Sequence, residues 1–535
     1  MANEDIFLGS GASLTFVPEQ DIYVKPASVD ATKTTLTPHS DFTGKYKLVP
    51  NLYVGCKIDY YDNTTYESSH IITSNTTSAI TFEPAIDSGE SSGNYLDTTN
   101  DYFIIRGYGA PCPAPFEATS NELRLNADNW LGLVEAATFP NVEVEMKQMN
   151  LALGGTRNYT YQFKGIETSS GGNLGFMSNQ ATWLYYFFGK LDSITHSANT
   201  GVTADSYGSG EYFTAPTADS YFIEVSPLST GPIFYRSIGT VSCPPVLRSF
   251  DSETDMKRLI RTTTNGTALT DPILYTFSEQ NGEDLPSFAL EHTLSKLDGT
   301  SNAARDTSTL YHTEGATTET KNFVRIARGN RVNTLTMTAN ENEELKITLD
   351  LNTRTVDDIN SLCTTEVYEA RNGVEAETSF QNYNATTNDR DTFLEPFFFS
   401  DGYFKAYGQQ FLKITNFTLT MNNNLQDKRF VGAGSKSIKS AIPAQRTYEL
   451  SFTALVTDDT LFQELRNSTE NLTQDIELKF TKDNGEYVEL KFQDYFTTSN
   501  TWTIPDDKGP ITVEATIMPR TMSSCKVNTH WVLQG

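Results

Sequence analysis

The six histidines and five cysteines are the residues with which this 535-residue chain could hold a metal or form a nucleophile. The histidines stand apart, without an HxH or HExxH spacing, and none lies near a pair of cysteines. The cysteines occur singly, without a CxxC pair, so we expect free thiols at Cys56, Cys112, Cys243, Cys363 and Cys525. The sequence therefore predicts no metal site and no cofactor.

Acidic residues are too numerous to identify a catalytic pair. The chain holds 67 Asp and Glu, so any two carboxylates close in sequence could be read as an acid–base dyad. The glycine-containing start Gly9–Ser13 superficially resembles a phosphate loop, but it lacks the further glycines, the lysine and the following helix. A turn before a strand explains it better. We expect no enzymatic activity.

One charged segment stands out from this acidic background. From Lys428 to Arg446 the chain carries five basic residues and no acid: Lys428, Arg429, Lys436, Lys439 and Arg446. The segment could be an ordinary solvated loop, or it could be a docking loop for an acidic partner. Because the formal net charge of the chain is -27, another copy of the same chain is an obvious acidic partner.

Composition limits the classes of protein to consider. A net charge of -27 and a pI near 4.6 argue against gripping nucleic acid through a general basic surface. Hydrophobic residues make up 38 % and aromatic residues 12 %, which argues against intrinsic disorder. The start of the chain is acidic and the most apolar block is Trp183–Phe188, so we expect no signal peptide, no membrane segment and synthesis in the cytoplasm.

Alternation of apolar and polar residues predicts that most elements are strands. Val142–Met146 and Tyr159–Phe163 read as a hairpin with a long tip. Two more strand pairs and three late strands show the same period: Val332–Thr338 with Leu345–Leu351, Ile414–Met421 with Thr447–Leu455, then Ile476–Phe480, Tyr487–Phe492 and Ile511–Met518. The basic segment connects the strands of the third region and is therefore expected to be exposed.

Helices are expected at only two places. Asn179–Gly189 ends in a glycine, a natural C-terminal stop, and Thr457–Arg466 begins with hydroxyl and carboxylate caps. The segment Asn199–Ser220 is poor in large aliphatic residues, so we expect a surface loop or a disordered tip there. The chain is therefore expected to be mainly β.

Strand pairs recur around each helix, which suggests two similar β-rich domains. We expect tandem β-sandwich domains, each with a flanking helix, plus a small β insertion module in which Leu52–Cys56 is one strand. The expected divisions are an N-terminal arm and first strands (1–45), a small β module (46–115), domain 1 with inserted loops (116–370), a linker (371–392) and domain 2 (393–535).

Several segments, in their joint order, resemble tail tube (major tail) proteins of long-tailed bacteriophages and related tailed viruses. The resemblance covers about half of the chain, chiefly its C-terminal half, and no motif in it is a catalytic signature. The segments that carry it are Asp5–Pro18, Leu285–Leu294, Arg328–Thr338, Glu395–Gly402, Ile414–Leu425, Thr457–Phe462 and Asp506–Ala515.

The resemblance implies a structural protein of the virion tail, built from tail-tube-type β-sandwich domains whose sheets join between copies around a channel for viral DNA. Two such domains in one chain favour a trimeric ring over a hexameric one, with rings stacked into a tube and other tail proteins at its ends. The resemblance also implies that the synthesis takes place in the host cytoplasm, that the DNA passes without specific binding, and that the module 46–115, which simpler members of the family lack, faces outward. Loops that reach the next ring are also implied, a role carried onto Lys428, Arg429, Lys436, Lys439 and Arg446 and, in the loop 150–157, onto Arg157.

A second class of protein stays open at this point. Threonine- and asparagine-rich strands with exposed aromatic residues also occur in surface or secreted β-rich proteins that bind glycans or mediate adhesion. The acidic start of the chain, which lacks the pattern of a signal peptide, favours the tail tube.

Overall fold

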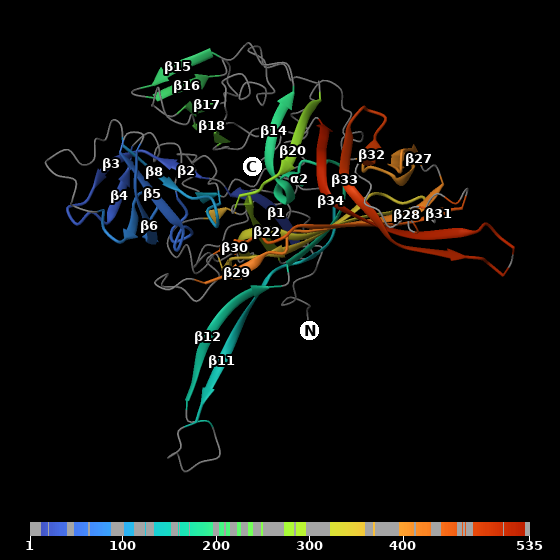
Figure 1. Cartoon of the computed structure of the whole chain (residues 1–535). Helices are drawn as coiled ribbons and strands as arrows, with labels where there is room; N and C mark the ends of the chain where they lie inside the picture. Colours follow the sequence, from blue (N-terminus) through green and yellow to red (C-terminus); the bar gives the residue numbers. More distant parts are fainter. Residues whose placement is uncertain are drawn as a thin grey trace, which may run out of the picture.

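The structure is a computed structural model of the whole chain, and it consists of strands with very few helical residues (Figure 1). It describes residues 12–19, 21–39, 48–62, 65–86, 101–111, 123–124, 133–150, 159, 161–170, 172–195, 203–207, 210–214, 222–225, 234–238, 248–249, 272–282, 285–295, 322–358, 368–369, 395–410, 413–429, 440–456, 459, 463, 466, 475–506 and 508–529. The predicted linker 371–392 lies outside these residues.

A separate seven-stranded antiparallel sheet forms the N-terminal module, drawn in blue in Figure 1. Its strand order is β2-β8-β5-β6-β7-β4-β3. The bounds are β2 Ile22–Val24, β3 Pro26–Val29, β4 Thr35–Pro38, β5 Lys57–Asp62, β6 Thr65–Asn75, β7 Ile80–Glu83 and β8 Tyr102–Ile105. Strands β2 to β4 lie in the part that the sequence assigned to an N-terminal arm, so this sheet begins well before residue 46.

The segment Leu52–Cys56 is a turn, and its prediction as a strand is wrong. Backbone hydrogen bonds join Leu52 to Val49 and Cys56 to Tyr53, the three-residue spacing of a tight turn. Gly55 adopts a φ of 80°, which a β-branched or bulky residue would rarely tolerate. The apolar run looked like a strand because Leu52 and Tyr53 are fully buried in the core of the module.

A 16-stranded sheet forms the main body. Its longest path runs β10-β13-β23-β22-β28-β31-β34-β33-β32-β26-β27. Strands from the first half are β1 Ala12–Glu19, β10 Leu133–Thr138, β13 Gly172–Met177, β14 Gly189–Thr195, β20 Ile273–Glu279, β21 Ser287–Ser295, β22 Asn322–Asn340, β23 Lys346–Asn352 and β24 Thr355–Asp358. Those from the second half are β26 Gly402–Ala406, β27 Gln409–Gln410, β28 Ile414–Asn422, β31 Thr447–Leu455, β32 Ile476–Thr481, β33 Tyr487–Thr503 and β34 Thr512–Thr529.

The same pairing scheme occurs once in each half of this sheet. In the first half β10 pairs with β13, β13 with β23 and β23 with the distal part of β22, residues 331–340. In the second half β28 pairs with β31, β31 with β34 and β34 with the distal part of β33, residues 497–503. The register irregularities also match, at Val134/Ala136 and Ile414/Asn416, and again at Val332/Thr334 and Thr497/Ser499.

The proximal parts of the long strands repeat a second scheme. In the first half, β1, β21, the proximal part of β22 (322–330) and β24 lie side by side in that order. In the second half, the order is β26, β32, the proximal part of β33 (487–492) and the end of β34. Each long strand therefore passes from one four-stranded array into the other. The two halves are joined where distal β22 pairs with β28, and where β20 pairs with β34.

One hydrophobic core runs under both halves of the main sheet. It includes Phe176 and Trp183 from the first half and Phe452 and Phe480 from the second. The short helix α2 (Leu184–Phe188) lies in this core with four of its five side chains buried. It ends at Gly189, as predicted, whose φ is 91° and whose N–H bonds to the carbonyl of Tyr185.

The module lies on the far side of the β21–β22 array from this core. Successive residues of a strand point to opposite faces. Phe288 and Leu290 of β21 enter the main core, whereas Ala289 belongs to the core of the module. Val324 and Ile326 of β22 also face the module.

Smaller elements extend from these bodies. The strands β11 (Asn141–Met149) and β12 (Tyr161–Ser170) form a long two-stranded arm that projects away from the body (Figure 1). The others are the sheet of β15 Thr203–Tyr207, β16 Gly210–Thr214, β17 Phe222–Val225, β18 Phe234–Ile238 and β19 Arg248–Ser249, the pairs β9 Leu123–Arg124 with β25 Tyr368–Glu369 and β29 Gln426–Lys428 with β30 Ser440–Ile442, and the 3-10 turn η3 Phe399–Asp401.

The three predicted strand regions are confirmed, as β11 with β12, β22 with β23 and β28 with β31. The segment Asn199–Ser220 was predicted to be a loop or a disordered tip, and this is wrong because it contains β15 and β16. Of the second predicted helix, only Asp459, Gln463 and Arg466 are described; the last two are helical.

Candidate assembly surfaces

The distal sheet (β10, β13, β23, distal β22, β28, β31, first part of β34, distal β33) has one apolar face and one polar face. In β28, for example, Phe417, Leu419 and Met421 are buried, and the threonines and asparagines between them face the other way. The ladder carries that polar face from strand to strand, through pairs such as Thr348 with Thr336 and Thr336 with Thr420.

The polar face, defined by the residues that these ladders align, is rich in hydroxyl and amide groups. Its members in the central strands are Thr334, Thr336, Thr338, Asn340, Thr348, Asn416, Thr418, Thr420, Asn422, Thr447, Ser451, Thr453, Thr512 and Thr516. Among the described residues that these ladders align, the charges are Asp350, Glu449 and Glu514 against Lys346 and Arg331. Arg331, which pairs with Asn352, is only 2 % exposed and donates a 2.7 Å hydrogen bond to the carbonyl of Ala441. Asn173 holds Asp350 by a 2.6 Å hydrogen bond. The threonines alternate with apolar residues within each strand of the sequence, but their alignment from one strand to the next depends on the strand pairing.

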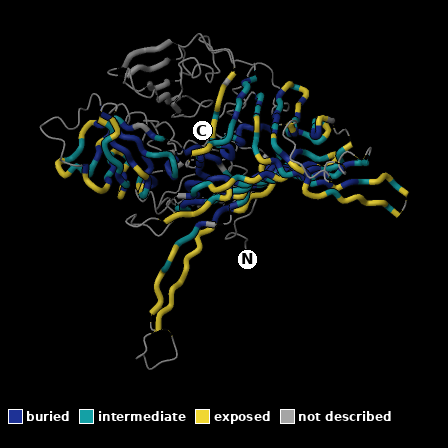
Figure 2. Tube along the Cα trace, in the orientation of Figure 1, coloured by how far each residue is buried: buried dark blue, intermediate teal, exposed yellow. Residues whose placement is uncertain are grey.

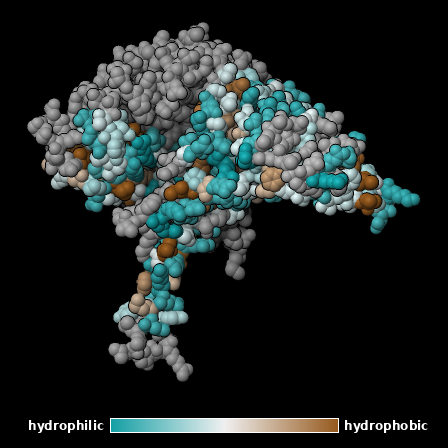
Figure 3. All heavy atoms as spheres, in the orientation of Figure 1, coloured by the Kyte–Doolittle hydropathy of each residue, from teal (hydrophilic) through white to brown (hydrophobic). Residues whose placement is uncertain are grey.

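The distal sheet has two edges that no described strand covers. One is β10 and the other is distal β33, whose hairpin with β34 projects from the body in red in Figure 1. Figure 2 shows exposed residues toward the end of that hairpin. Trp502 is 42 % exposed and Ile504 76 % exposed, and Figure 3 shows hydrophobic surface near the end of this hairpin.

Strand β11 of the arm is exposed along its whole length, and β12 is exposed or half-buried up to Ser169, which is buried at the base of the arm (Figure 2). Apolar residues nevertheless recur on it: Val142, Val144, Met146, Met149, Tyr159, Tyr161, Phe163 and Ile166. An isolated two-stranded ribbon is marginally stable in water, and exposed apolar side chains of this density mark contact surfaces. The arm extends from β10–β13 as the β29–β30 pair extends from β28–β31.

The predicted basic residues are only partly described. Lys428 and Arg429 are exposed, beside the base of the arm, where Arg429 Nη2 donates a 3.4 Å hydrogen bond to the carbonyl of Glu167. Lys436, Lys439 and Arg157 lie outside the described residues.

Arg446 is placed differently. Its side chain is only 13 % exposed, with Nη1 3.7 Å from Glu279 Oε2, and its Nε donates a 2.7 Å hydrogen bond to Asn423 Oδ1. A role for Arg446 between rings would require breaking these internal contacts.

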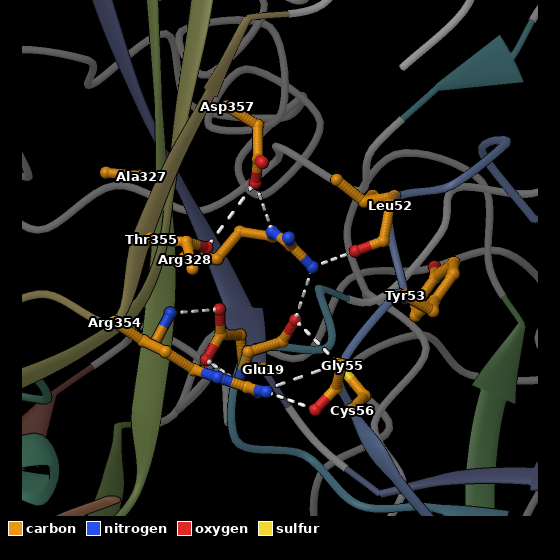
Figure 4. Close-up of polar contacts among 12 residues, drawn as sticks. Glu19, Leu52, Tyr53, Gly55, Cys56, Ala327, Arg328, Arg354, Thr355 and Asp357 are labelled. Atoms are coloured by element: carbon orange, nitrogen blue, oxygen red, sulfur yellow. Dashed lines mark hydrogen bonds and ion pairs between the residues drawn. The ribbon is translucent and has the colours of Figure 1, made fainter. Parts of the chain in front are cut away.

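A buried carboxylate lies where the module meets the main sheet (Figure 4). Glu19, at the end of β1, accepts hydrogen bonds from the N–H groups of Gly109 at 2.8 Å and Gly329 at 2.7 Å and from the hydroxyl of Ser287 at 2.5 Å. Burial raises the pKa of Glu19, and these three donors offset part of that effect. The sequence offered no signal for this residue.

Two buried arginines extend the same junction (Figure 4). Arg328 bridges Asp357, at 2.6 Å, to the carbonyls of Leu52 and Gly109. Arg354 donates to the carbonyls of Tyr108, at 2.6 Å, and Gly55. Because the acceptors belong to the module and the arginines to the main sheet, these bonds fix the module in one orientation.

Within the described ranges there is no cluster of His, Cys, Asp and Glu that could hold a metal ion. Cys56 and Cys525 are buried free thiols, as predicted for these two. No helix in the described part of the chain is long and apolar enough to cross a membrane.

A comparison with family models found one that covers most of this architecture. The model, described as "Phage tail tube protein", matches residues 108–521, well over half of the chain. The chain belongs to the phage tail tube protein family. A search of the curated proteins found no match.

Membership of the phage tail tube family confirms the resemblance and makes the chain a structural protein of the virion tail. The family match begins at residue 108, directly after β8, so the module lies before the part that defines the family. The mainly β fold is also confirmed. The candidate surfaces of this tail tube protein are those on which copies could meet: the polar face, the two free edges, the arm and the basic segment.

Proposed function

We propose that three copies of this tail tube protein form a ring, and that rings stack into a hollow tube through which viral DNA passes. The observation that carries the proposal is the repeated pairing scheme of the distal sheet, which leaves one free edge at each end. A sheet with two complementary free edges can close by joining copies around an axis, which removes the exposed edges. Each chain contributes two tandem units to such a ring, and three chains supply six.

The polar face would line the channel. It carries mainly hydroxyl and amide groups, with Asp350, Glu449 and Glu514 against Lys346. DNA is held by proteins chiefly through neutralised phosphates, so a wall with few cations lets it slide. The module packs on the β21–β22 array, on the side that faces away from the main core and from the polar face. It would therefore point outward from the channel.

Stacking would use the arm and the basic segment. The arm projects away from the body and carries apolar side chains, for which the next ring supplies a partner (Figure 1). The exposed cations Lys428 and Arg429, together with Lys436, Lys439 and Arg157, would face an acidic neighbour.

Negative-stain electron microscopy of the purified full-length protein tests the proposal. We expect rings and short tubes with a central channel. Monomers at all concentrations, without rings or tubes, would contradict it.

The stacking role of the basic segment is tested by reversing charge. We expect the double variant Lys436→Glu with Lys439→Glu to keep a folded protomer and to form shorter tubes. Tubes of the natural protein should shorten as the salt concentration rises, because exposed ion pairs are screened. Electron microscopy measures tube length, and circular dichroism checks folding. Unchanged tube lengths would show that these lysines do not hold rings together.

A further inference from the structure

The junction between the two halves of the chain supplies a template for the contact between two chains. We propose that distal β33 of one chain pairs antiparallel with residues 137–142 of a second copy, in the register with which distal β22 pairs with β28. The inference rests on the proposed ring and names the strands, the partner and the register.

The register follows from matching rows of paired residues in the two halves. In the first half one row runs Val134, Phe176, Ile347, Met337. In the second half the corresponding row runs Ile414, Ala454, Val513, Trp502.

Distal β33 therefore corresponds to distal β22, and β10 corresponds to β28. Within the chain, Met337 pairs with Leu419, five residues after Ile414. Trp502 should accordingly pair with the residue five after Val134, which is Phe139 of the second copy. The same register pairs Thr503 with Thr138 and Ile504 with Ala137.

The exposed fractions of side chains at corresponding positions in the two halves support a contact with a second copy. Met337 and Ala339 are 0 % and 1 % exposed, and they lie in the core to which both halves of the chain contribute. Their counterparts Trp502 and Ile504 are 42 % and 76 % exposed. Large apolar side chains at positions buried in the other half are what a shared interface leaves exposed in the single chain.

Pro140 fits this register. Hydrogen bonds from Asn423 to Asn333 and from Glu341 to Thr415, both 2.8 Å, fix which pairs of the β22–β28 ladder are hydrogen-bonded. Antiparallel pairs alternate, so Thr336 with Thr420 is a non-hydrogen-bonded pair.

Pro140 corresponds to Thr420 and would face Thr501 in such a pair. Its nitrogen then points away from the second copy, so the absent N–H costs the contact between chains no hydrogen bond.

Disulfide cross-linking tests the register in the full-length protein. Thr138 and Thr503 are exposed and would form a non-hydrogen-bonded pair, whose Cα atoms lie about 4.5 Å apart, a separation a disulfide can bridge. We expect Thr138→Cys with Thr503→Cys to link different chains on mild oxidation of assembled rings. Thr338→Cys with Thr418→Cys, the corresponding pair within one chain, is the positive control and should link without joining chains.

A displaced pair, Thr138→Cys with Thr501→Cys, is the matched control, since its diagonal separation of about 7–8 Å is too long. We expect about tenfold more linked chains from the in-register pair than from the displaced pair. Rings in which the displaced pair links better, or in which neither pair links although Thr338→Cys with Thr418→Cys does, would overturn the register. A protein that forms no rings would overturn the proposed function and this contact with it.

Discussion

At the scale of single residues, buried charges serve to hold parts of the molecule together. Asp59 of β5 is 1 % exposed and contacts Arg106 Nε at 2.5 Å, Lys57 Nζ at 3.2 Å and the hydroxyl of Ser69. Arg106 also binds Asp21 at 2.7 Å, at the start of β2. The cluster joins β5 and β6 of the module to the residue after β8 and the residue before β2, as Glu19 and the two arginines join the module to the main sheet.

Replacing Asp59 by Asn should weaken the module by about 2 kcal/mol at neutral pH, since buried donors lose their acceptor. Burial raises the pKa of Asp59, but the hydrogen bonds from Ser69 and Arg106 outweigh it and hold the pKa below its usual value. A lowered pKa contributes stability above the unfolded value, near 4, that is lost as the pH falls through the folded value. The variant should lose this acid dependence.

Pulsed hydrogen exchange, at a fixed labelling pH after equilibration in urea, measures the opening of β5 and β8. Asp62→Asn, at an exposed position of the same strand, is the control and should leave both stability and acid dependence unchanged. An equal loss in both variants would contradict the role assigned to Asp59.

At the scale of elements, alternation in the sequence predicted strands well where one face is buried and the other polar. Strand β28 is an example, with alternately buried residues from Phe417 onward. It failed for β15 and β16, since hydrophobic alternation is weak in 199–220. It also could not give the partner of a strand: the pairing of β22 with β28 joins residues far apart in sequence, and no local pattern specifies it.

The same limit explains the candidate site. The basic residues were visible as a run of charge, whereas the polar face and free edges arise from the order of strands. The end of α2 at Gly189 could be predicted, because a glycine that ends a helix does so through its own backbone conformation and needs no distant partner.

Gly189→Ala should destabilise the main body by about 2 kcal/mol, because φ is 91° and an added Cβ would lie 2.8 Å from Gln280 Cβ and 2.9 Å from Leu285 Cδ2. Gly175→Ala is the control, since its Cβ would meet nothing closer than 3.5 Å. Urea unfolding followed by fluorescence of the buried Trp183 measures both. Equal midpoints for the two variants would contradict the strain at Gly189.

The polar face gives a prediction about DNA. Tubes of the natural protein should not retain double-stranded DNA even at low salt, whereas Glu449→Lys with Glu514→Lys should retain it, in a manner that weakens steeply with salt. Co-sedimentation of labelled DNA with intact tubes measures this. Asp62→Lys, in the module, adds a cation away from this face and should have a smaller effect. Equal retention by both variants would show that the polar face does not line the channel.

At the scale of the whole molecule, the net charge of -27 opposes the association of copies, and the repeated pairing scheme supplies the matched surfaces that permit it. A strongly acidic chain repels its own copies at long range, so assembly depends on matched surfaces: the free edges, the apolar arm and the basic segment. The long strands β22 and β33 belong to both arrays of their half, so each half is built around one strand. Two halves already joined within one chain make one of the contacts of the proposed ring permanent.

That permanence determines the number of chains expected in a ring. If each half occupies one of six equivalent positions, a ring holds three chains, and native mass spectrometry of single rings should give three times the chain mass of 59.5 kDa. Raising the salt should loosen the part of the stacking that rests on exposed charges, which is screened, and should leave the paired edges within a ring intact. The Thr138→Cys with Thr503→Cys variant, oxidised before the salt is raised, should give a denaturation-resistant species of the same three-chain mass. A six-chain ring would mean that the two halves do not take equivalent positions, whatever the likeness of their strand pairing.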